Sequence, residues 1–360
     1  MAFAFAGCSK KKNTGTSGQA SASNAESLQL FHENGEYGYR DAAGTVVIKP
    51  QFVEAQDFSW GLAPVKPDAK HGWGYIDASG NEVIHPQYEA AGQFAEGIAV
   101  VLNKGQFVYI GPDGESMGSF DEDRSSKPLA AGDTLYVIHP GGLIARASGS
   151  LNAAPVARLS PGDFVVAAKD PRPAQFDTFS GLRSRWQYVR CKGTTGYVFD
   201  LYLSRYPIAT ERQPVERYHL VGSTLNSDDY STYTLTKFVS GGRSIVHNGP
   251  DWTEDDEIVP DATVDQVVAR MELYPSGEIG PLVAGFNGVT RSYVTDVGDT
   301  VTVAIRRDAA GFLEQLSLAK KNEESLFDVT IAKYGASAAK VVTSTTTPPT
   351  SASDRAPNEF

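Results

Sequence analysis

The sequence predicts a mainly β chain built from several modules. Three observations carry this prediction. One stretch is written twice at a fixed offset, glycine and proline are abundant at 35 and 20 residues, and helical periodicity is scarce over the 360 residues. Short strands joined by glycine turns produce this combination. We therefore expect a hairpin repeat array, then a small barrel, then a further β-rich domain.

Residues 1–27 are expected to be a signal remnant and a flexible tether. Phe5-Ala-Gly-Cys8 resembles a bacterial lipobox, and this resemblance implies a diacylglyceryl group on Cys8. The tether is rich in Lys, Ser, Gly and Thr and cannot bury a core. Only seven residues precede Cys8, which is short for a signal peptide, so we expect the start of translation to lie upstream. The alternative is a chance match.

Residues 28–125 are predicted to be the repeat array. Tyr37–Val65 aligns with Trp73–Val101 without a gap at an offset of 73 − 37 = 36 residues, and 14 of 29 positions are identical. Self-similarity at that period indicates units that bury their apolar faces on one another. Each unit is predicted to form about three short strands. Gly74 and its counterpart Gly38 stand between two aromatic residues, which indicates a bulge or a close approach of two backbones.

The array resembles the WG (KWG) repeat family through Gly72-Trp-Gly-Tyr-Ile-Asp77 and Phe94-Ala-Glu-Gly97. The resemblance implies an interaction or envelope-associated array. Trp60 departs from it, because it stands where the second copy has Glu96. Aromatic residues at repeated positions usually fill the shared core. The expected core aromatics are Tyr39, Trp73, Tyr75 and Tyr109.

Residues 126–205 have a different pattern, which ends in a hairpin of two strands over 186–191 and 196–199. This segment resembles bacterial SH3 domains, which are small five-stranded barrels. The resemblance implies a groove that binds cell-wall peptide or glycan, or a protein. Candidate groove residues are Trp186, Tyr188, Tyr197, Tyr202, Arg146 and Arg190. The alternative for Trp186 and Tyr197 is that they fill the barrel interior.

Charge separates this middle segment from the rest of the chain. The whole chain carries −11, whereas residues 126–205 carry ten basic and five acidic side chains, or +5. The middle segment is therefore expected to meet an anionic partner, and the overall acidity argues against a nucleic-acid partner. Ordinary solvated charge is the alternative explanation.

Residues 206–341 are predicted to form a β-rich domain, a sandwich or a small barrel, with one helix over Ala262–Leu273. Val264, Val267, Val268 and Met271 recur at helical spacing there. Residues 342–360, rich in Thr, Ser and Pro, are expected to be disordered. The acidic run over 251–257 is interpreted as a hydrated loop.

No catalytic motif is evident. The six histidines are scattered, Walker and GxSxG motifs are lacking, and Cys191 is expected to be packed in a strand. We therefore predict no cofactor and no metal. The predicted function is a non-catalytic envelope lipoprotein that binds peptidoglycan or an envelope protein and reaches the membrane through Cys8. The alternative is a cell-wall hydrolase, or another enzyme, within residues 206–341.

Overall fold

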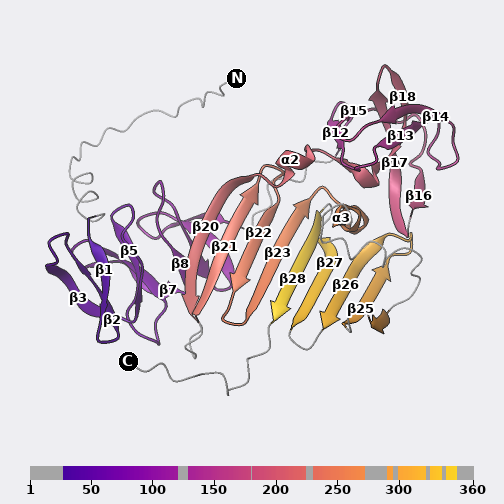
Figure 1. Ribbon diagram of the computed structural model, residues 1–360. Helices are drawn as coiled ribbons and strands as arrows, with labels where there is room; N and C mark the ends of the chain where they lie inside the picture. The colour runs from indigo at the N-terminus through magenta and orange to yellow at the C-terminus, as the bar shows by residue number, and fades with distance from the viewer. Residues whose placement is uncertain are drawn as a thin grey trace, which may run out of the picture. The chain divides into compact units, whose positions relative to one another are not determined.

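The structure is a computed structural model. It describes residues 27–120, 129–179, 181–223, 230–271, 290–294, 299–321, 325–334 and 338–346. The chain divides into two compact units: Met1–Glu122 with Leu220–Asp228, and Asp123–His219 with Asp229–Phe360. The prediction of a mainly β chain with hairpin repeats is confirmed (Figure 1). Cys8 and most of the expected tether lie outside the described residues.

The first unit contains two small antiparallel sheets, β1-β2-β3 and β4-β5-β6-β7, and the antiparallel run β11-β10-β9-β8, which continues into β20. Leu220–Gly222, the end of β20 (Pro214–Ser223), pairs with β8. The strands are β1 (Gln29–Glu33), β2 (Glu36–Arg40), β3 (Val46–Phe52), β4 (Glu54–Ala55), β5 (Leu62–Lys66), β6 (Trp73–Asp77), β7 (Glu82–Tyr88), β8 (Ala90–Gly92), β9 (Ala99–Asn103), β10 (Gln106–Ile110) and β11 (Ser116–Ser119).

The two sequence copies have the same strand register. Tyr39 pairs with Ile48 in the first copy, and Tyr75 pairs with Ile84 in the second, each beside a bulge. Gly74 lies where two backbones nearly touch, since a Cβ there would stand 2.5 Å from the carbonyl oxygen of Ile84. The equivalent distance for Gly38 is 2.6 Å from Ile48. The expected close approach at these glycines is therefore confirmed.

Trp60, which departs from the repeat pattern, lies in a tight turn. Trp60 and Gly61 both have positive φ, at 55° and 81°, and Glu96 and Gly97 have 51° and 81°. Two consecutive positive φ angles match the right-handed twist of a hairpin. The Trp60 side chain is 54% exposed, so this position tolerates unlike residues in the two copies.

The second unit begins with the segment predicted to resemble an SH3 domain, residues 126–205, which is here called the middle module. Its strand order is β14-β13-β18-β17-β15-β12-β19, with β16 also paired to β17. Its elements are β12 (Thr134–Val137), β13 (Leu143–Arg146), β14 (Pro155–Leu159), β15 (Phe164–Ala167), β16 (Phe176–Phe179), β17 (Leu182–Cys191), β18 (Thr194–Phe199), the 3-10 turn η1 (Asp200–Tyr202) and β19 (Leu203–Ser204).

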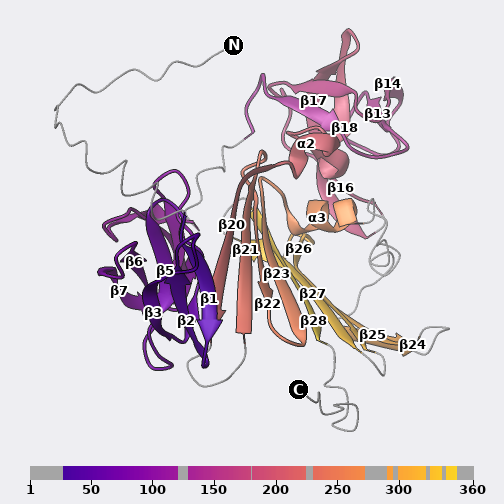
Figure 2. The same ribbon diagram turned by 60° about the vertical axis from the view of Figure 1, so that its left-hand side comes forward.

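The remainder of the second unit is one antiparallel sheet in the order β21-β22-β23-β28-β27-β26-β25-β24. Helix α3 lies on one face of this sheet, as Figures 1 and 2 show. The elements are α2 (Ile208–Glu211), β21 (Tyr230–Phe238), β22 (Arg243–Asn248), β23 (Trp252–Pro260), α3 (Val264–Met271), β24 (Thr290–Val294), β25 (Thr300–Arg307), β26 (Leu313–Lys321), β27 (Leu326–Tyr334) and β28 (Ala338–Thr346).

The predicted helix is confirmed as α3, and its start has a capping box. The backbone N–H of Gln266 donates to the hydroxyl of Thr263, and the N–H of Thr263 donates to the Gln266 side chain. Its apolar side, with Val264, Val267 and Val268, is buried. The helix therefore begins where its sequence satisfies two backbone donors.

The expected barrels are corrected, because both sheets of the second unit are open in the described residues. One buried core explains why. Leu182 and Trp186 of the middle module, Val268 of α3 and Leu316 of the large sheet belong to the same apolar cluster. An apolar face that is covered by a neighbouring element does not have to close on itself or recruit a second sheet. The boundary expected at residues 205/206 thus crosses a shared core.

Two predictions for the large sheet, one for the acidic run and one for the tail, are also corrected. The acidic run is not a loop but the strand β23, where Asp256 pairs with Lys340 and Glu257 with Arg212. Residues 342–346, expected in the disordered tail, belong to β28 and pair on both sides. Threonine fits a pleated strand well, so composition alone misled the prediction. Residues 347–360 lie outside the described part.

Candidate functional site

The expected core aromatics of the array are placed in two equivalent settings. Tyr39, Trp73 and Tyr75 are at most 1% exposed. The Tyr39 hydroxyl donates to the carbonyl oxygen of Gln56 at 2.7 Å, and that of Tyr75 donates to Gly92 at 2.7 Å. Tyr109 is only half-buried. These residues stabilise the repeats and present no ligand surface, apart from the partly exposed Tyr109.

The candidate groove residues of the middle module do not form one group. Trp186, Tyr197 and Tyr202 are buried at 2%, 0% and 6% exposure. Trp186 and Tyr197 therefore occupy the interior positions that the core alternative describes. Tyr188 is half-buried and packs against Tyr197 with the two rings tilted and their centroids 4.9 Å apart. Arg190 is exposed and lines a separate, shallow hollow.

Three of these residues meet in one cleft of about 480 Å³, here called the arginine cleft. Trp186 and Tyr202 form part of its apolar wall, and Arg146 provides a cation. Arg158, on the exposed side of β14, provides a second cation that the sequence analysis did not single out. None of the described residues that line this cleft is acidic. The other lining residues are His139, Pro140, Gly141, Gly142, Leu143, Ile144, Leu151, Leu159, Ser160, Pro161, Phe179 and Phe199.

Polar atoms in this cleft differ in how far they are satisfied. The Arg146 guanidinium donates to the carbonyl oxygen of Ala153 at 2.7 Å, which holds that side chain in place. The His139 ring lies edge-on to Tyr202 at 4.6 Å. The indole nitrogen of Trp186 is buried with no hydrogen-bond partner in the described structure. An unpaired buried donor is uncommon in a native core.

Tyr188 lies at a different hollow, beside Lys169, Asp170 and Arg172. Arg172 stands over the Tyr197 ring at 4.3 Å and donates to its hydroxyl at 2.8 Å. That hydroxyl in turn donates to Asp170 at 2.5 Å. Burial raises the pKa of the Tyr197 hydroxyl, and the bond to Asp170 adds to the rise. Arg172 is therefore occupied by internal contacts, and Tyr188 has no part in the arginine cleft.

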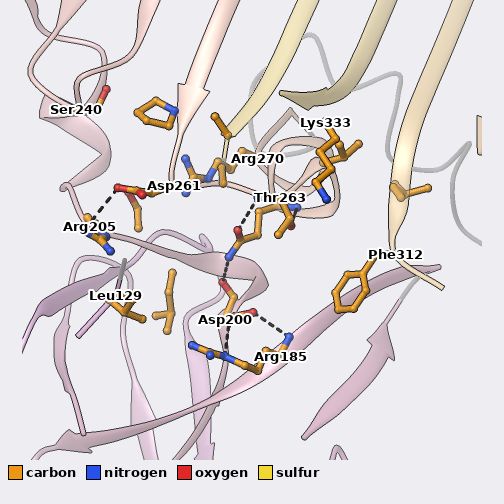
Figure 3. Close-up of a pocket in the computed structure, with 18 of the residues that line it drawn as sticks. Leu129, Arg185, Asp200, Arg205, Ser240, Asp261, Thr263, Arg270, Phe312 and Lys333 are labelled. Atoms are coloured by element: carbon orange, nitrogen blue, oxygen red, sulfur yellow. Dashed lines mark hydrogen bonds and ion pairs between the residues drawn. The ribbon is translucent and has the colours of Figure 1, made fainter. Parts of the chain in front are cut away.

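A second cleft, of about 460 Å³, lies between the middle module and the large sheet and is here called the Lys333 cleft (Figure 3). Arg185 lies beside Asp200 there, with Nε and Oδ2 3.8 Å apart, and Arg205 lies beside Asp261 at 3.6 Å. Lys333 reaches the cleft from β27, away from both pairs. Sequence reasoning missed this site, because its residues come from segments far apart in the chain.

Asp200 is the most perturbed acid of this cleft. Burial raises the pKa of its carboxyl to about 6, against the lowering effect of bonds from the Ser184 hydroxyl and of the Arg185 charge. Its side chain retains 17% exposure. Asp200 can therefore take up a proton in mildly acidic solution while it remains part of the cleft wall.

Metal and thiol chemistry have little structural support in the described residues. No group of three or more His, Cys, Asp or Glu side chains there is arranged to hold a metal ion. Cys191 is buried, and burial raises the pKa of its thiol, which disfavours the reactive thiolate. Among the helices described, none has the length and apolar character needed to cross a bilayer.

Comparison with known families supports the prediction that the array consists of WG repeats. Residues 37–70 and 73–107 match the family described as WG containing repeat. No curated protein and no solved structure matches the chain. The two matched segments coincide with the two sequence copies and with the equivalent Tyr39 and Tyr75 settings. Residues 37–70 and 73–107 are therefore two WG repeats.

Proposed function

We propose that this protein is a non-catalytic binding scaffold of the bacterial cell envelope. The middle module binds an anionic envelope ligand, with peptidoglycan as first choice, and the ligand enters the arginine cleft. The large sheet supports the module, because the two share one apolar core. A lipid at Cys8 holds the chain to the membrane.

One observation carries the binding proposal. The arginine cleft combines aromatic and aliphatic walls with two arginines, and no acidic side chain lines it among the described residues. Its volume of about 480 Å³ falls within the range of about 300–1,000 Å³ that is usual for ligand pockets. An aromatic wall suits the apolar faces of sugars and peptides. The site is thus selective by charge as well as by shape.

Wall peptides supply the matching charge, since they carry free carboxylates. An arginine guanidinium binds a carboxylate through two parallel hydrogen bonds. Arg158 is exposed and has no ion-pair partner in the described structure, so its guanidinium is available. Arg146 is already positioned by Ala153. We infer that Arg158 contributes most of the charge-dependent binding.

The cleft is suited to binding and not to catalysis. Its described lining contains one histidine, His139, and no carboxylate or thiol. General acid–base catalysis needs a positioned proton donor and acceptor near the reacting bond, and a nucleophile needs an activating base. A lone imidazole that lies edge-on to Tyr202 meets neither requirement.

The test is co-sedimentation of the whole chain with purified sacculi, because the middle module shares its core with the large sheet. Arg158→Glu should weaken binding about tenfold or more at low salt, which corresponds to about 1.4 kcal/mol. Arg190→Glu is the matched control, since it makes the same charge change at an exposed residue of the same module outside the cleft. Moderate salt should weaken wild-type binding through screening.

Equal losses in both variants would show that overall module charge, and not the cleft, governs binding. If the folded wild-type chain stays in the supernatant at low salt, peptidoglycan is not the ligand. An envelope protein then becomes the leading partner, and crosslinking in cells would identify it.

The proposed lipid anchor is tested separately. The motif Phe5-Ala-Gly-Cys8 is the basis for the proposed lipid on Cys8, and an acylated cysteine keeps a protein at a membrane. Metabolic labelling with an alkynyl fatty acid should mark the wild-type chain in its native host. Labelling that persists in Cys8→Ser would refute the assignment.

A further inference from the structure

We propose that the Lys333 cleft is a second binding site, and that it takes an amphipathic carboxylate, a molecule with one carboxylate and an apolar body. The site is independent of the arginine cleft and shares no lining residue with it. It lies at the junction of the middle module, α3 and the large sheet (Figure 3).

The interior of the cleft is suited to an apolar body. Its volume of about 460 Å³ is within the range for small-molecule sites. Leu135 and Leu203 come from the middle module, Val264 from the start of α3, and Leu313 from β26. Phe312, half-buried, presents an aromatic ring to the same space. Contact with such side chains removes apolar ligand surface from water, which is favourable.

The charged side chains that line the cleft in the described part of the chain are engaged in ion pairs or hydrogen bonds inside the protein, with one exception. The carboxylates of Asp200 and Asp261 face Arg185 and Arg205, and Glu211 accepts a bond from Arg270. The two remaining acids are also engaged, because Asp308 accepts backbone N–H bonds in its own turn and Glu314 pairs with Arg306. Within the described part of the chain, Lys333 is the charged lining residue without a partner.

Lys333 is placed to meet the charged end of such a ligand. It follows Ile331 by two residues on β27, so its side chain leaves the sheet on the face that α3 covers. It is also exposed, so its ammonium group is hydrated, whereas the leucines and the valine of the cleft are buried. An ammonium group in this position attracts a carboxylate and forms a charge-assisted hydrogen bond with it. Charge complementarity and the apolar interior together define the ligand class.

The experiment uses the whole chain and three probes of matched chain length: laurate, dodecanol and dodecyl phosphate, each titrated calorimetrically below its aggregation limit. Laurate should bind wild type better than dodecanol. Lys333→Met keeps the apolar stem and removes the charge, and it should weaken laurate binding about tenfold and leave dodecanol binding unchanged. Lys321→Met is the control, an exposed lysine of β26 that does not line the cleft.

Phe312→Ala tests the apolar part and should weaken laurate and dodecanol equally. Phe312 also lies edge-on to Phe176, with ring centroids 5.5 Å apart, so its loss can destabilise the fold. The binding result for Phe312→Ala therefore counts only if its melting temperature equals that of wild type. If the melting temperature falls, Phe312→Leu is used in its place. The proposal is overturned if laurate does not bind, if Lys333→Met binds it as wild type does, or if dodecyl phosphate binds better than laurate.

Discussion

The WG repeats and the second unit are both β-rich, yet they differ in how far apart their stabilising partners lie in sequence. In the repeats, the hydroxyls of Tyr39 and Tyr75 each bond a carbonyl 17 residues away, and the Ser59 hydroxyl bonds Phe94 35 residues away. In the second unit, the Asp265 carboxylate accepts N–H bonds from Arg183 and Leu313, 82 and 48 residues away. The structure of one repeat can therefore be predicted largely from its own residues and those of its neighbour. The structure of the second unit depends on contacts between segments far apart in the chain.

The largest expected effect concerns the repeats. Gly74→Ala places a Cβ 2.5–2.9 Å from backbone atoms of Ile84 and Pro86. Backbone cannot move aside as a flexible side chain does, so we expect about 4 kcal/mol or more of destabilisation, read from urea unfolding. Gly35→Ala is the control, since Gly35 has φ +86° and open space around it and should lose only about 1 kcal/mol. Similar losses at both sites would refute the close-approach explanation.

The next effect tests the long-range contacts of the second unit. Asp265 is fully buried and joins β17 to β26 through α3. Asp265→Ala leaves two backbone donors unpaired and should cost about 3 kcal/mol. Asp308→Ala also removes an acceptor of two N–H bonds, but within one exposed turn, and should cost about 1 kcal/mol. If the two variants unfold at the same urea concentration, the long-range bonds of Asp265 are no more important than a local turn.

The smallest effect is a pH dependence. Burial raises the folded-state pKa of Asp200 to about 6 from the ordinary value of 3.8 for an aspartate carboxyl. Between these values the folded chain binds the proton more tightly, so this stabilisation is present below about pH 4 and is lost as the pH rises through 6. Asp200→Asn has no titrating carboxyl at this position and therefore lacks this pH-dependent stabilisation. The unfolding free energy of the variant minus that of wild type should rise by on the order of 2 kcal/mol from pH 4 to 7. A flat difference would contradict the role of burial.

Sequence was sufficient for the parts of the fold that local patterns specify. The equivalence of the two repeats, the close approach at Gly74 and the helix α3 were all predicted from local sequence patterns. The open sheets of the second unit do not, because no pattern in the middle module shows that Leu182 and Trp186 pack on α3. Composition was misleading in β28, where threonines occur in a paired strand.

The candidate sites were predictable only in part. Aromatic and basic residues in the middle module indicated a groove, and Trp186, Tyr202 and Arg146 do share a cleft. The sequence could not tell which residue faces which cavity, so Tyr188 and Arg190 were assigned to the same groove although they line other hollows. The Lys333 cleft left no local signal, because strand alternation places Lys333 on the α3 face only once the position of α3 is known.

The shared core of the second unit limits how this protein can be divided or recombined. A cut between residues 205 and 206 would leave Leu182 on one fragment and Val268 and Leu316 on the other, each with an apolar face bared to water. Such faces promote aggregation. Gene rearrangement could therefore move the middle module to another protein only together with the sheet beneath it. The WG repeats carry most of their apolar partners with them, so they are the portable part of the chain.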